Sequence, residues 1–306
     1  MPIRLEDYTE AHKPALAARL DAEGLTKREG AVGLFWQTLL SDPYKQNSVI
    51  VVATEDAGEG AGEGRAVHGI GIGMRRPYGR DSGRPVFYWV ATEKRRQGIG
   101  AMLKQAIGKR LAAAGVPTQY GSLFNGQEDA IPFLTATGFQ QICCDLIIGW
   151  NGGEYTYKPV EGVSCAIYRG GDPVLNEKIA AFQNKAFVRE TMVPHLTGDS
   201  IEHILVNEKH WMMVATEDAT GEVVGVTECS DTNIFPSISV ARRYWASGLA
   251  EWIGGLSLDI YVAAGITDPW TIVRPVNRAS LAYLARMNWH EKGTITSFGA
   301  PTQDDA

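Results

Sequence analysis

The chain has 306 residues, of which 44% are hydrophobic and 21% are charged, and its net charge is -6. This length and composition are typical of a globular chain with two domains. The acidic balance gives no bulk attraction to phosphate backbones, so we expect no nucleic-acid partner. No apolar run reaches about 18 residues, and no basic region precedes an apolar stretch at the start. We therefore expect no membrane partner and a cytoplasmic location.

A repeated pattern indicates two copies of one unit. Residues 52–57 read Val-Ala-Thr-Glu-Asp-Ala, and the same run recurs at 214–219. Further along, matching positions are separated by a constant 150 residues: Val90 and Val240, Gly98 and Gly248, Gly115 and Gly265, Phe139 and Trp289. The separation changes only across 58–65 and 75–84, which read as turns. We predict a first domain at 1–150, a linker at 151–162 and a second domain at 163–306.

Taken in chain order, the apolar patterns predict the same elements in both copies. The first copy has strands at 3–5, 48–54, 67–73, 86–91 and 119–124, with helical segments after the first strand and a helix at 98–114. The second copy has the corresponding strands at 164–168, 211–216, 223–229, 237–240 and 271–273, with a helix at 248–264. A glycine that can adopt a left-handed cap follows each long helix. Strands and helices mixed in this way predict an α/β fold.

The segment from Val90 to Gly100 lies between a predicted strand and a predicted helix. Glycines at 98 and 100 let the backbone approach a ligand closely. The first N–H groups of a helix have no partner within the helix, and its dipole is positive at that end. This combination is an anion site, and Lys94, Arg95 and Arg96 add positive charge in front of it. A diphosphate is the expected ligand.

Residues 95–100, Arg-Arg-Gln-Gly-Ile-Gly, resemble the acyl-CoA loop of the GNAT acetyltransferase superfamily, and the order of elements in both copies is similar to that family. The resemblance implies a mixed, mostly antiparallel sheet flanked by helices in each copy, and acetyl-CoA as the acyl donor. It implies that the acyl-pantetheine arm is lined by Val90, Ala91 and Thr92 and touched by Asn125. The diphosphate would be held by Arg95, Arg96, Gln97, Gly98, Ile99 and Gly100.

The second copy departs from this pattern. Val240, Gly248, Ala250 and Asn277 occupy positions that the resemblance assigns to CoA binding. Trp245, however, stands where Arg95 stands in the first copy. A diphosphate could still bind there through backbone groups.

A proton donor for the leaving thiolate is suggested in the second copy only. Tyr283 falls at the position of the family's general acid, and a tyrosine hydroxyl can serve that role. The matching residue in the first copy is Phe133, which has no proton to donate. Two arrangements remain open: catalysis in the second copy with a CoA-binding first copy, which we favour, or transfer in the first copy without a tyrosine. Glu228 is a candidate base that would act through water.

These features predict an N-acyltransferase that transfers an acetyl group, or another short acyl group, from acyl-CoA to a primary amine of a small molecule, as a monomer or homodimer. One alternative is an aminoacyl-tRNA-dependent aminoacyl transferase of the same tandem fold, which would lack a CoA loop. Another is a non-catalytic acyl-CoA-binding module. The histidines and cysteines show no metal-ligand spacing, so no metal is expected.

Overall fold

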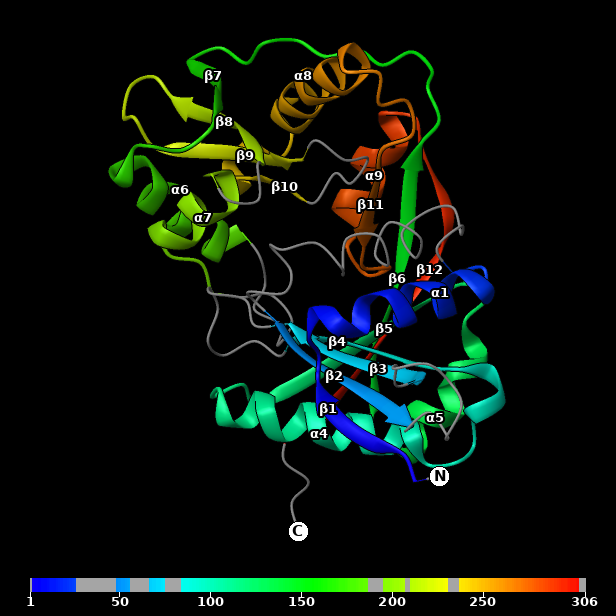
Figure 1. Ribbon diagram of the computed structural model, residues 1–306. Coiled ribbons are helices and arrows are strands. Elements are labelled where there is room, and N and C mark those ends of the chain that lie inside the picture. The colour runs from blue at the N-terminus through cyan, green and yellow to red at the C-terminus, as the bar shows by residue number, and fades with distance from the viewer. Residues whose placement is uncertain are drawn as a thin grey trace. The chain divides into compact units, whose positions relative to one another are not determined.

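The structure is a computed structural model that describes residues 2–25, 48–55, 66–74, 84–186, 195–206, 210–230 and 237–302. The stretches 58–65 and 75–83, where the two copies were expected to differ in length, lie outside the described residues. The chain forms two compact units (Figure 1). Unit 1 comprises Met1–Ser122, Gln127–Ile142 and Ser297–Ala306, and unit 2 comprises Leu123–Gly126 and Cys143–Thr296.

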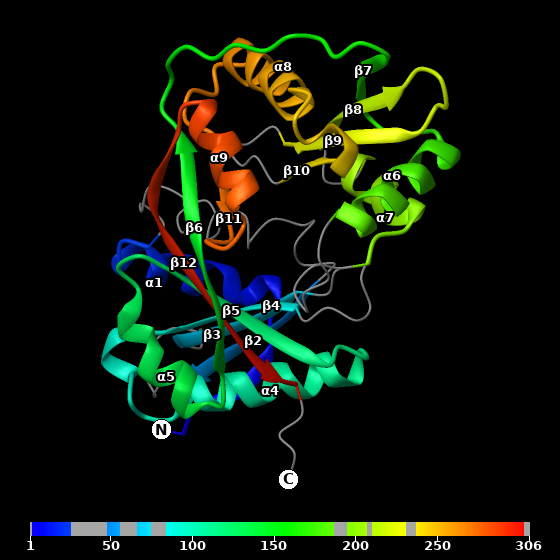
Figure 2. The ribbon, with the colours of Figure 1, turned by 180° about the vertical axis from the view of Figure 1, so that it is seen from behind.

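Unit 1 is a mixed sheet between helices. Its elements are β1 (Arg4–Asp7), α1 (Lys13–Ala22), β2 (Ser48–Glu55), β3 (Ala66–Met74), β4 (Arg84–Val90), α4 (Ile99–Ala113), β5 (Thr118–Phe124) and α5 (Ile131–Ala136). Strands β1 to β4 pair antiparallel in sequence order, whereas β5 pairs parallel with β4. Figures 1 and 2 show α1 on one face of this sheet and α4 on the other.

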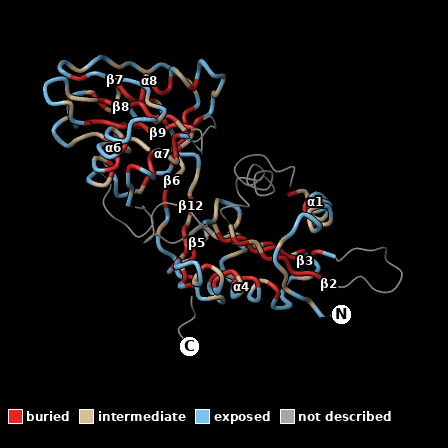
Figure 3. The backbone as a smooth tube through the Cα atoms, turned by 60° about the vertical axis from the view of Figure 1, so that its left-hand side comes forward, coloured by how far each residue is buried: buried red, intermediate tan, exposed pale blue. Residues whose placement is uncertain are grey.

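Alternating glycines on β3 bring α4 close to the sheet. A Cβ at Gly73 would lie 2.8 Å from both Ile107 and Leu111 of α4, which are fully buried. Burial of each such side chain stabilises the fold by roughly 1.5–3 kcal/mol. The strands β2 and β3 are buried along most of their length (Figure 3).

Unit 2 repeats this order of elements. It contains β7 (Val163–Tyr168), α6 (Pro173–Ala186), α7 (Gly198–Val206), β8 (Trp211–Glu217), β9 (Val223–Cys229), β10 (Ser237–Val240), α8 (Leu249–Ala263), β11 (Trp270–Val273) and α9 (Arg278–Arg286). Strands β7 to β10 form an antiparallel sheet in the order β10-β9-β8-β7. Helices α6 and α7 lie on one face of this sheet and α8 on the other (Figure 1).

The two sheets share an irregularity that marks them as copies. The register between β2 and β3 shifts between Ala53 and Thr54, and that between β8 and β9 shifts between Ala215 and Thr216. These pairs lie at matching places in the repeated run. Irregularities of this kind are retained among related folds. Because both copies have one at the same position, the duplication seen in the sequence extends to the backbone.

The compact units differ from the continuous division expected at residue 150. Strand β6 (Gln140–Trp150) begins in unit 1 and belongs to unit 2 from Cys143 onward, where it pairs with β11. Strand β12 (Trp289–Pro301) begins in unit 2, and from Ser297 onward it belongs to unit 1. There the Thr302 hydroxyl donates to the Val116 carbonyl at 2.7 Å. An apolar pattern marks a strand but does not specify its neighbour, so the sequence could not reveal this exchange.

The expected linker at 151–162 packs as part of unit 2. The Tyr155 hydroxyl donates to Asp259 of α8 at 2.6 Å, and Tyr157 donates to the other oxygen of the same carboxylate. The ring of Tyr157 lies against Gly255, where a Cβ would clash with it. Small and acidic residues on α8 therefore accommodate this segment.

Within the described residues, no helix is long and apolar enough to cross a membrane. All four cysteines lie in the described residues, and none forms a disulfide; Cys229 is buried and Cys144 is exposed.

Candidate functional site

The loop of unit 1 that the sequence singled out connects β4 to α4. At the end of β4 the Ala91 N–H donates to the His68 carbonyl at 2.9 Å. A single 3-10 turn, Thr92–Lys94, follows, and Gly98 adopts a left-handed conformation (φ 80°) at the start of α4. Only glycine takes that conformation without cost, which explains its presence there.

The backbone N–H groups of this loop are available to a ligand. Arg96 also has a positive φ of 60°, uncommon for a residue with a side chain. Left-handed residues such as Arg96 and Gly98 also occur in the anion-binding nests that backbone N–H groups form in proteins. Within the described part of the chain, the N–H groups from Arg96 to Gly100 have no hydrogen-bond acceptor. The first turn of α4 contains no acidic residue, so nothing opposes its positive dipole end.

The position of Gly100 is tightly constrained. A Cβ there would lie 2.7 Å from the ring of Phe133, which stacks edge-on against Tyr88 with ring centroids 6.0 Å apart. Because contacts under 3 Å require a shift of one partner, Gly100 lets the first turn of α4 approach α5. The neighbouring Ile99 is buried in the core beneath α4, so its backbone N–H rather than its side chain faces the loop.

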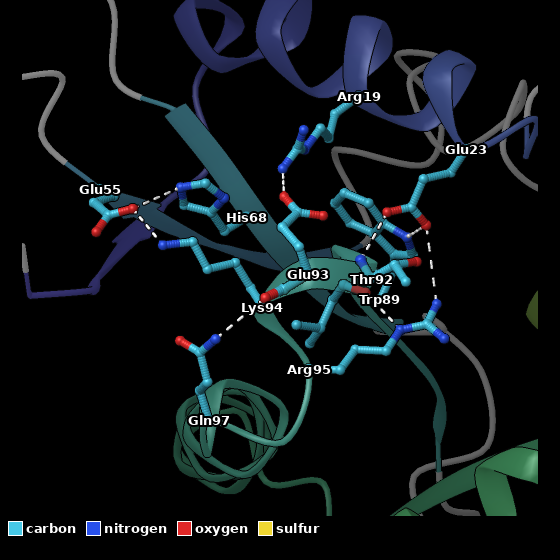
Figure 4. A network of polar contacts seen from close by, with 11 residues as sticks. Arg19, Glu23, Glu55, His68, Trp89, Thr92, Glu93, Lys94, Arg95 and Gln97 are labelled. Atoms are coloured by element: carbon cyan, nitrogen blue, oxygen red, sulfur yellow. Dashed lines mark hydrogen bonds and ion pairs between the residues drawn. The ribbon is translucent and has the colours of Figure 1, made fainter.

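Only part of the positive charge expected here is free to meet a ligand (Figure 4). The Lys94 ammonium donates to Glu55 at 2.6 Å, and His68 lies 3.0 Å from the same carboxylate. The bond from Lys94 lowers the pKa of Glu55 to about 2, and burial lowers the pKa of His68. Lys94 therefore anchors the turn. Arg96 is exposed and, among the described residues, has no ion-pair partner.

Glu23, at the end of α1, holds the start of the loop. Its carboxylate accepts from the Thr92 N–H at 2.9 Å and from the Trp89 indole at 3.2 Å. The Arg95 guanidinium lies 3.9 Å from the same group and donates to the Val90 carbonyl at 3.1 Å. Gln97 donates to the Glu93 carbonyl at 3.2 Å, and Glu93 pairs with Arg19. A network of side chains thus fixes the turn and leaves its outer N–H groups exposed.

Strands β4 and β5 separate beside this loop. They pair only through Arg84 with Gln119 and Pro85 with Tyr120, at the beginning of β4. From Val86 to Val90, β4 keeps its pairing with β3 but has no pairing with β5. The backbone of Val90, Ala91 and Thr92 therefore lies at the open end of a divergent strand pair.

The corresponding loop of unit 2 begins and ends like that of unit 1, but its N–H groups form hydrogen bonds within the loop. Gly248 is left-handed (φ 85°) at the start of α8, as Gly98 is in unit 1. The Ser247 N–H donates back to the Tyr244 carbonyl at 3.1 Å, and the Leu249 N–H donates to the Ser247 hydroxyl at 3.2 Å. The Trp245 indole donates to the Val240 carbonyl at 3.1 Å, replacing the guanidinium of unit 1.

One of the two arginines in the unit 2 loop is neutralised by acidic side chains. Arg243 pairs with Glu222 at 2.9 Å and Glu217 at 3.4 Å. Glu251 lies in the first turn of α8, close to Ala250, and pairs with Arg286. A carboxylate so close to a helix N-terminus opposes a second anion, so unit 2 offers a poorer diphosphate site than unit 1.

The predicted catalytic residue Tyr283 is buried in unit 2. It lies on α9 with 5% of its surface exposed, and its hydroxyl lies against the backbone of Gly254 in α8 and near Ile238 of β10. Burial raises the pKa of Tyr283, which keeps the phenol protonated. Its counterpart by the sequence repeat is Phe133 of α5, whose ring lies against Gly100 at the start of α4, whereas Gly254 matches Lys104, one turn further along that helix.

The two asparagines assigned to the CoA arm have structural partners. Asn125 belongs to unit 2, and its Oδ1 accepts from the N–H and hydroxyl of Thr294 at 3.0 and 2.7 Å. The side chain of Asn277 caps α9 by accepting from the Ser280 N–H at 3.2 Å. Unit 2 thus contains Asn277 together with Val240, Gly248, Ala250 and Tyr283.

Sequence reasoning missed the acidic residues that anchor the loops. Glu55 ends β2 and holds Lys94, and Glu217 ends β8 and accepts from the Tyr244 hydroxyl at 2.7 Å. Both glutamates belong to the repeated run, which could have indicated a shared role. Glu23 has no such signal. Among the described residues, no group of three histidine, cysteine or acidic side chains could hold a metal ion.

No protein-family model and no curated protein matches this sequence. Solved structures do match over the full chain. A tandem GNAT protein from the clavulanic acid biosynthesis pathway has a TM-score of 0.71 at 13% identity, covering 100% of both chains. A GCN5-related N-acetyltransferase from Sphaerobacter thermophilus has a TM-score of 0.67 at 17% identity, covering 99% of this chain and 97% of that one.

A third match is the GCN5-related glucosamine N-acetyltransferase region of a fungal multi-domain GH3 beta-N-acetylglucosaminidase. Its TM-score is 0.68 at 13% identity, covering 97% of this chain and 38% of that one. The chain therefore has the tandem GNAT fold, which confirms the fold predicted from the loop motif and the repeat. Identities this low establish the fold and leave the activity to be argued from the site.

Proposed function

We propose that this protein is an acyl-CoA-dependent N-acyltransferase, with acetyl-CoA as the donor and a primary amine of a small molecule as the acceptor. The observation that carries the proposal is the open run of N–H groups from Arg96 to Gly100 at the start of α4. The tandem GNAT fold, which the acetyltransferases named above also have, supports the same reading.

The residues of unit 1 fit the diphosphate of an acyl-CoA. A diphosphate needs several converging donors and positive charge, and this loop offers backbone N–H groups, the dipole of α4 and the Arg96 guanidinium. The Arg95 side chain can add a second cation by leaving the Val90 carbonyl. That movement would also free the carbonyl for the acyl-bearing arm, beside the gap between β4 and β5.

An acyl-CoA supplies an activated thioester carbonyl. The neutral acceptor amine forms a bond to that carbon, its nitrogen loses one proton, the carbon–sulfur bond breaks, and the thiolate takes up a proton. Tyr283 is our candidate donor of that proton for a thioester held in unit 2, because it falls at the position that the resemblance assigns to the general acid. Transfer within unit 1, where Phe133 replaces the tyrosine, is the competing arrangement.

Calorimetric titration with CoA tests the binding step, and release of free thiol from acetyl-CoA in the presence of an amine panel tests the chemistry. We expect CoA to bind at the α4 loop of unit 1, and that binding to be lost when Gly98→Val blocks the left-handed cap. The matched control is Gly248→Val in unit 2, which should leave CoA binding intact. Absence of any binding heat with the wild-type protein would refute the proposal.

A non-catalytic acyl-CoA-binding module is the second candidate, favoured by the enclosed hydroxyl of Tyr283 and by Phe133. Such a module would bind CoA with the same residues of unit 1. It would release no thiol with any amine, which separates it from the enzyme.

A further inference from the structure

Among the described residues, the outer edge of strand β7 has no partner. The unit 2 sheet has the order β10-β9-β8-β7, so β7 pairs with β8 on one side only (Figure 1). The Asp218 N–H donates to the Gly162 carbonyl, and because bonded pairs alternate along an antiparallel ladder, residues 164, 166 and 168 bond to β8. The N–H and C=O groups of Cys165 and Ile167 therefore point outward, where the described part of the chain offers them no partner.

This edge lacks the features that protect sheet edges. Charged side chains, prolines and bulges on an edge strand prevent it from pairing with another chain. The corresponding edge strand of unit 1, β1, has charged residues at Arg4, Glu6 and Asp7. Strand β7 reads Val-Ser-Cys-Ala-Ile-Tyr and keeps a regular register with β8, so it has none of these features. Its apolar residue Ile167 is 50% exposed.

The charges that flank β7 match those of a second copy of the same strand. Glu161 lies four residues before Cys165, and Arg169 lies four residues after it. Both side chains are exposed, and neither forms an ion pair within the described residues. If two copies of β7 run antiparallel about a two-fold axis at Cys165, Glu161 of each copy lies opposite Arg169 of the other. A register centred on any other residue loses both of these ion pairs.

The same register also satisfies the outward backbone groups. In an antiparallel pair, two directly opposed residues with outward groups exchange both of their bonds. The N–H and C=O of Cys165 would thus bond to those of Cys165 in the second copy, and the Ile167 N–H would meet the Val163 carbonyl of that copy. The Ile167 side chain would lie beside Val163, on the face where Val163 and Cys165 already belong to the apolar core.

We propose that two copies of this chain associate through β7, whose antiparallel pairing about Cys165 joins the two unit 2 sheets into one. Pairing of a single short strand is a small interface, so the dissociation constant of the dimer lies in the micromolar range. The surface contains none of the residues assigned to acyl-CoA. It therefore stands or falls independently of the proposed function.

Sedimentation velocity of the full-length protein, at concentrations from about 1 to about 500 µM, tests the association. We expect a transition from monomer to dimer as the concentration rises. Ile167→Lys places a charge on the edge and should raise the dissociation constant at least about tenfold. Val276→Lys, at another exposed apolar residue of unit 2 (81% exposed), is the matched control and should dimerise like the wild type. Slower hydrogen exchange at the Cys165 and Ile167 amides in the dimer reports on the strand edge itself.

Exchange of the flanking charges tests the register. Arg169→Glu and Glu161→Arg each place like charges opposite one another at both symmetric contacts, so each should raise the dissociation constant by about tenfold. The double variant restores opposite charges and should dimerise like the wild type. Thermal unfolding shows that each variant is folded.

Three results would overturn the inference. The wild type would sediment as a monomer at every concentration, Ile167→Lys would dimerise as well as the wild type, or the double variant would remain as weak as the single ones. Calorimetric titration of the same variants with CoA should show unchanged binding, which separates a failure of the dimer from a failure of the acyltransferase proposal.

Discussion

The loops that precede α4 and α8 begin and end with the same backbone conformations. They differ in whether the N–H groups at the start of the helix are available to a ligand. Ala91 and Ala241 begin a 3-10 turn with nearly the same dihedral angles, and Gly98 and Gly248 are both left-handed. Between these points the unit 1 chain is extended at Arg95 and left-handed at Arg96, whereas Trp245 of unit 2 is helical. Three residues in each loop thus decide whether a helix N-terminus is open to a ligand or bonded to its own turn.

Exchanging these three residues should have the largest effect. Arg95→Trp, Arg96→Ala and Gln97→Ser together place the unit 2 residues in unit 1. We expect CoA affinity to fall at least ~100-fold, or about 2.7 kcal/mol, because the serine closes the turn and both guanidinium groups are lost. Calorimetry measures the loss. The reverse exchange at Trp245, Ala246 and Ser247 is the control and should not weaken binding; undiminished affinity in the first variant would place CoA elsewhere.

The difference between Tyr283 and Phe133 can be removed by one substitution. Tyr283→Phe makes the two units alike at this position. If the phenol protonates the leaving thiolate, turnover should fall by about 100-fold while CoA affinity is unchanged, because the hydroxyl acts only on the developing thiolate. Thiol release and calorimetry give the two readouts. Turnover equal to that of the wild type would move the chemistry to unit 1.

The strands beneath the long helices differ at one position, because Gly73 of unit 1 corresponds by the repeat to Cys229 of unit 2. A Cβ would lie 2.8 Å from its nearest neighbour at Gly73 but 3.1 Å at Gly225. Gly73→Ala should therefore lower the free energy of unfolding by about 1–3 kcal/mol, and Gly225→Ala by less. Gly121→Ala, where the nearest atom is at 3.8 Å, is the control. Denaturant unfolding gives the order, and equal effects at the three glycines would contradict this account of packing.

The smallest effect concerns His68, where unit 2 has Val224. Burial lowers the pKa of His68 below 6.5, so in acid the unfolded chain takes up a proton that the folded chain resists. The stability of the wild type should therefore decrease as the pH falls below 6.5 and be unaffected by this group above it. His68→Val should flatten that dependence in thermal unfolding measured across the range. A slope that is the same in both proteins would show that His68 does not contribute to it.

Much of the candidate site could be predicted from local patterns. Gly98 and Arg96 to Gly100 were recognised because a glycine-containing stretch between a strand and a helix has few conformations, and those conformations expose N–H groups. The repeat likewise predicted that Gly98 and Gly248 would begin corresponding helices, and both are left-handed at the start of α4 and α8. Such inferences depend only on neighbours along the chain.

The contacts between distant residues could not be predicted in this way. Nothing near Glu23 in the sequence indicates that its carboxylate accepts hydrogen bonds from Thr92 and Trp89. Likewise, nothing near Lys94 indicates that its ammonium group pairs with Glu55. The interpretation of Lys94 as a phosphate-facing cation was wrong for this reason. The pairing of His210 with Glu228 also depends on two strands being placed side by side.

The sequence by itself determined the elements, their duplication and the glycine-containing helix start, because apolar period and backbone conformation are local properties of the chain. Only the tertiary structure decided which strand completes which unit, which cations of the loop remain available, and which strand lies at the edge of the unit 2 sheet. Those outcomes depend on residues that approach one another across the fold, where burial and charge pairing act through space rather than along the sequence.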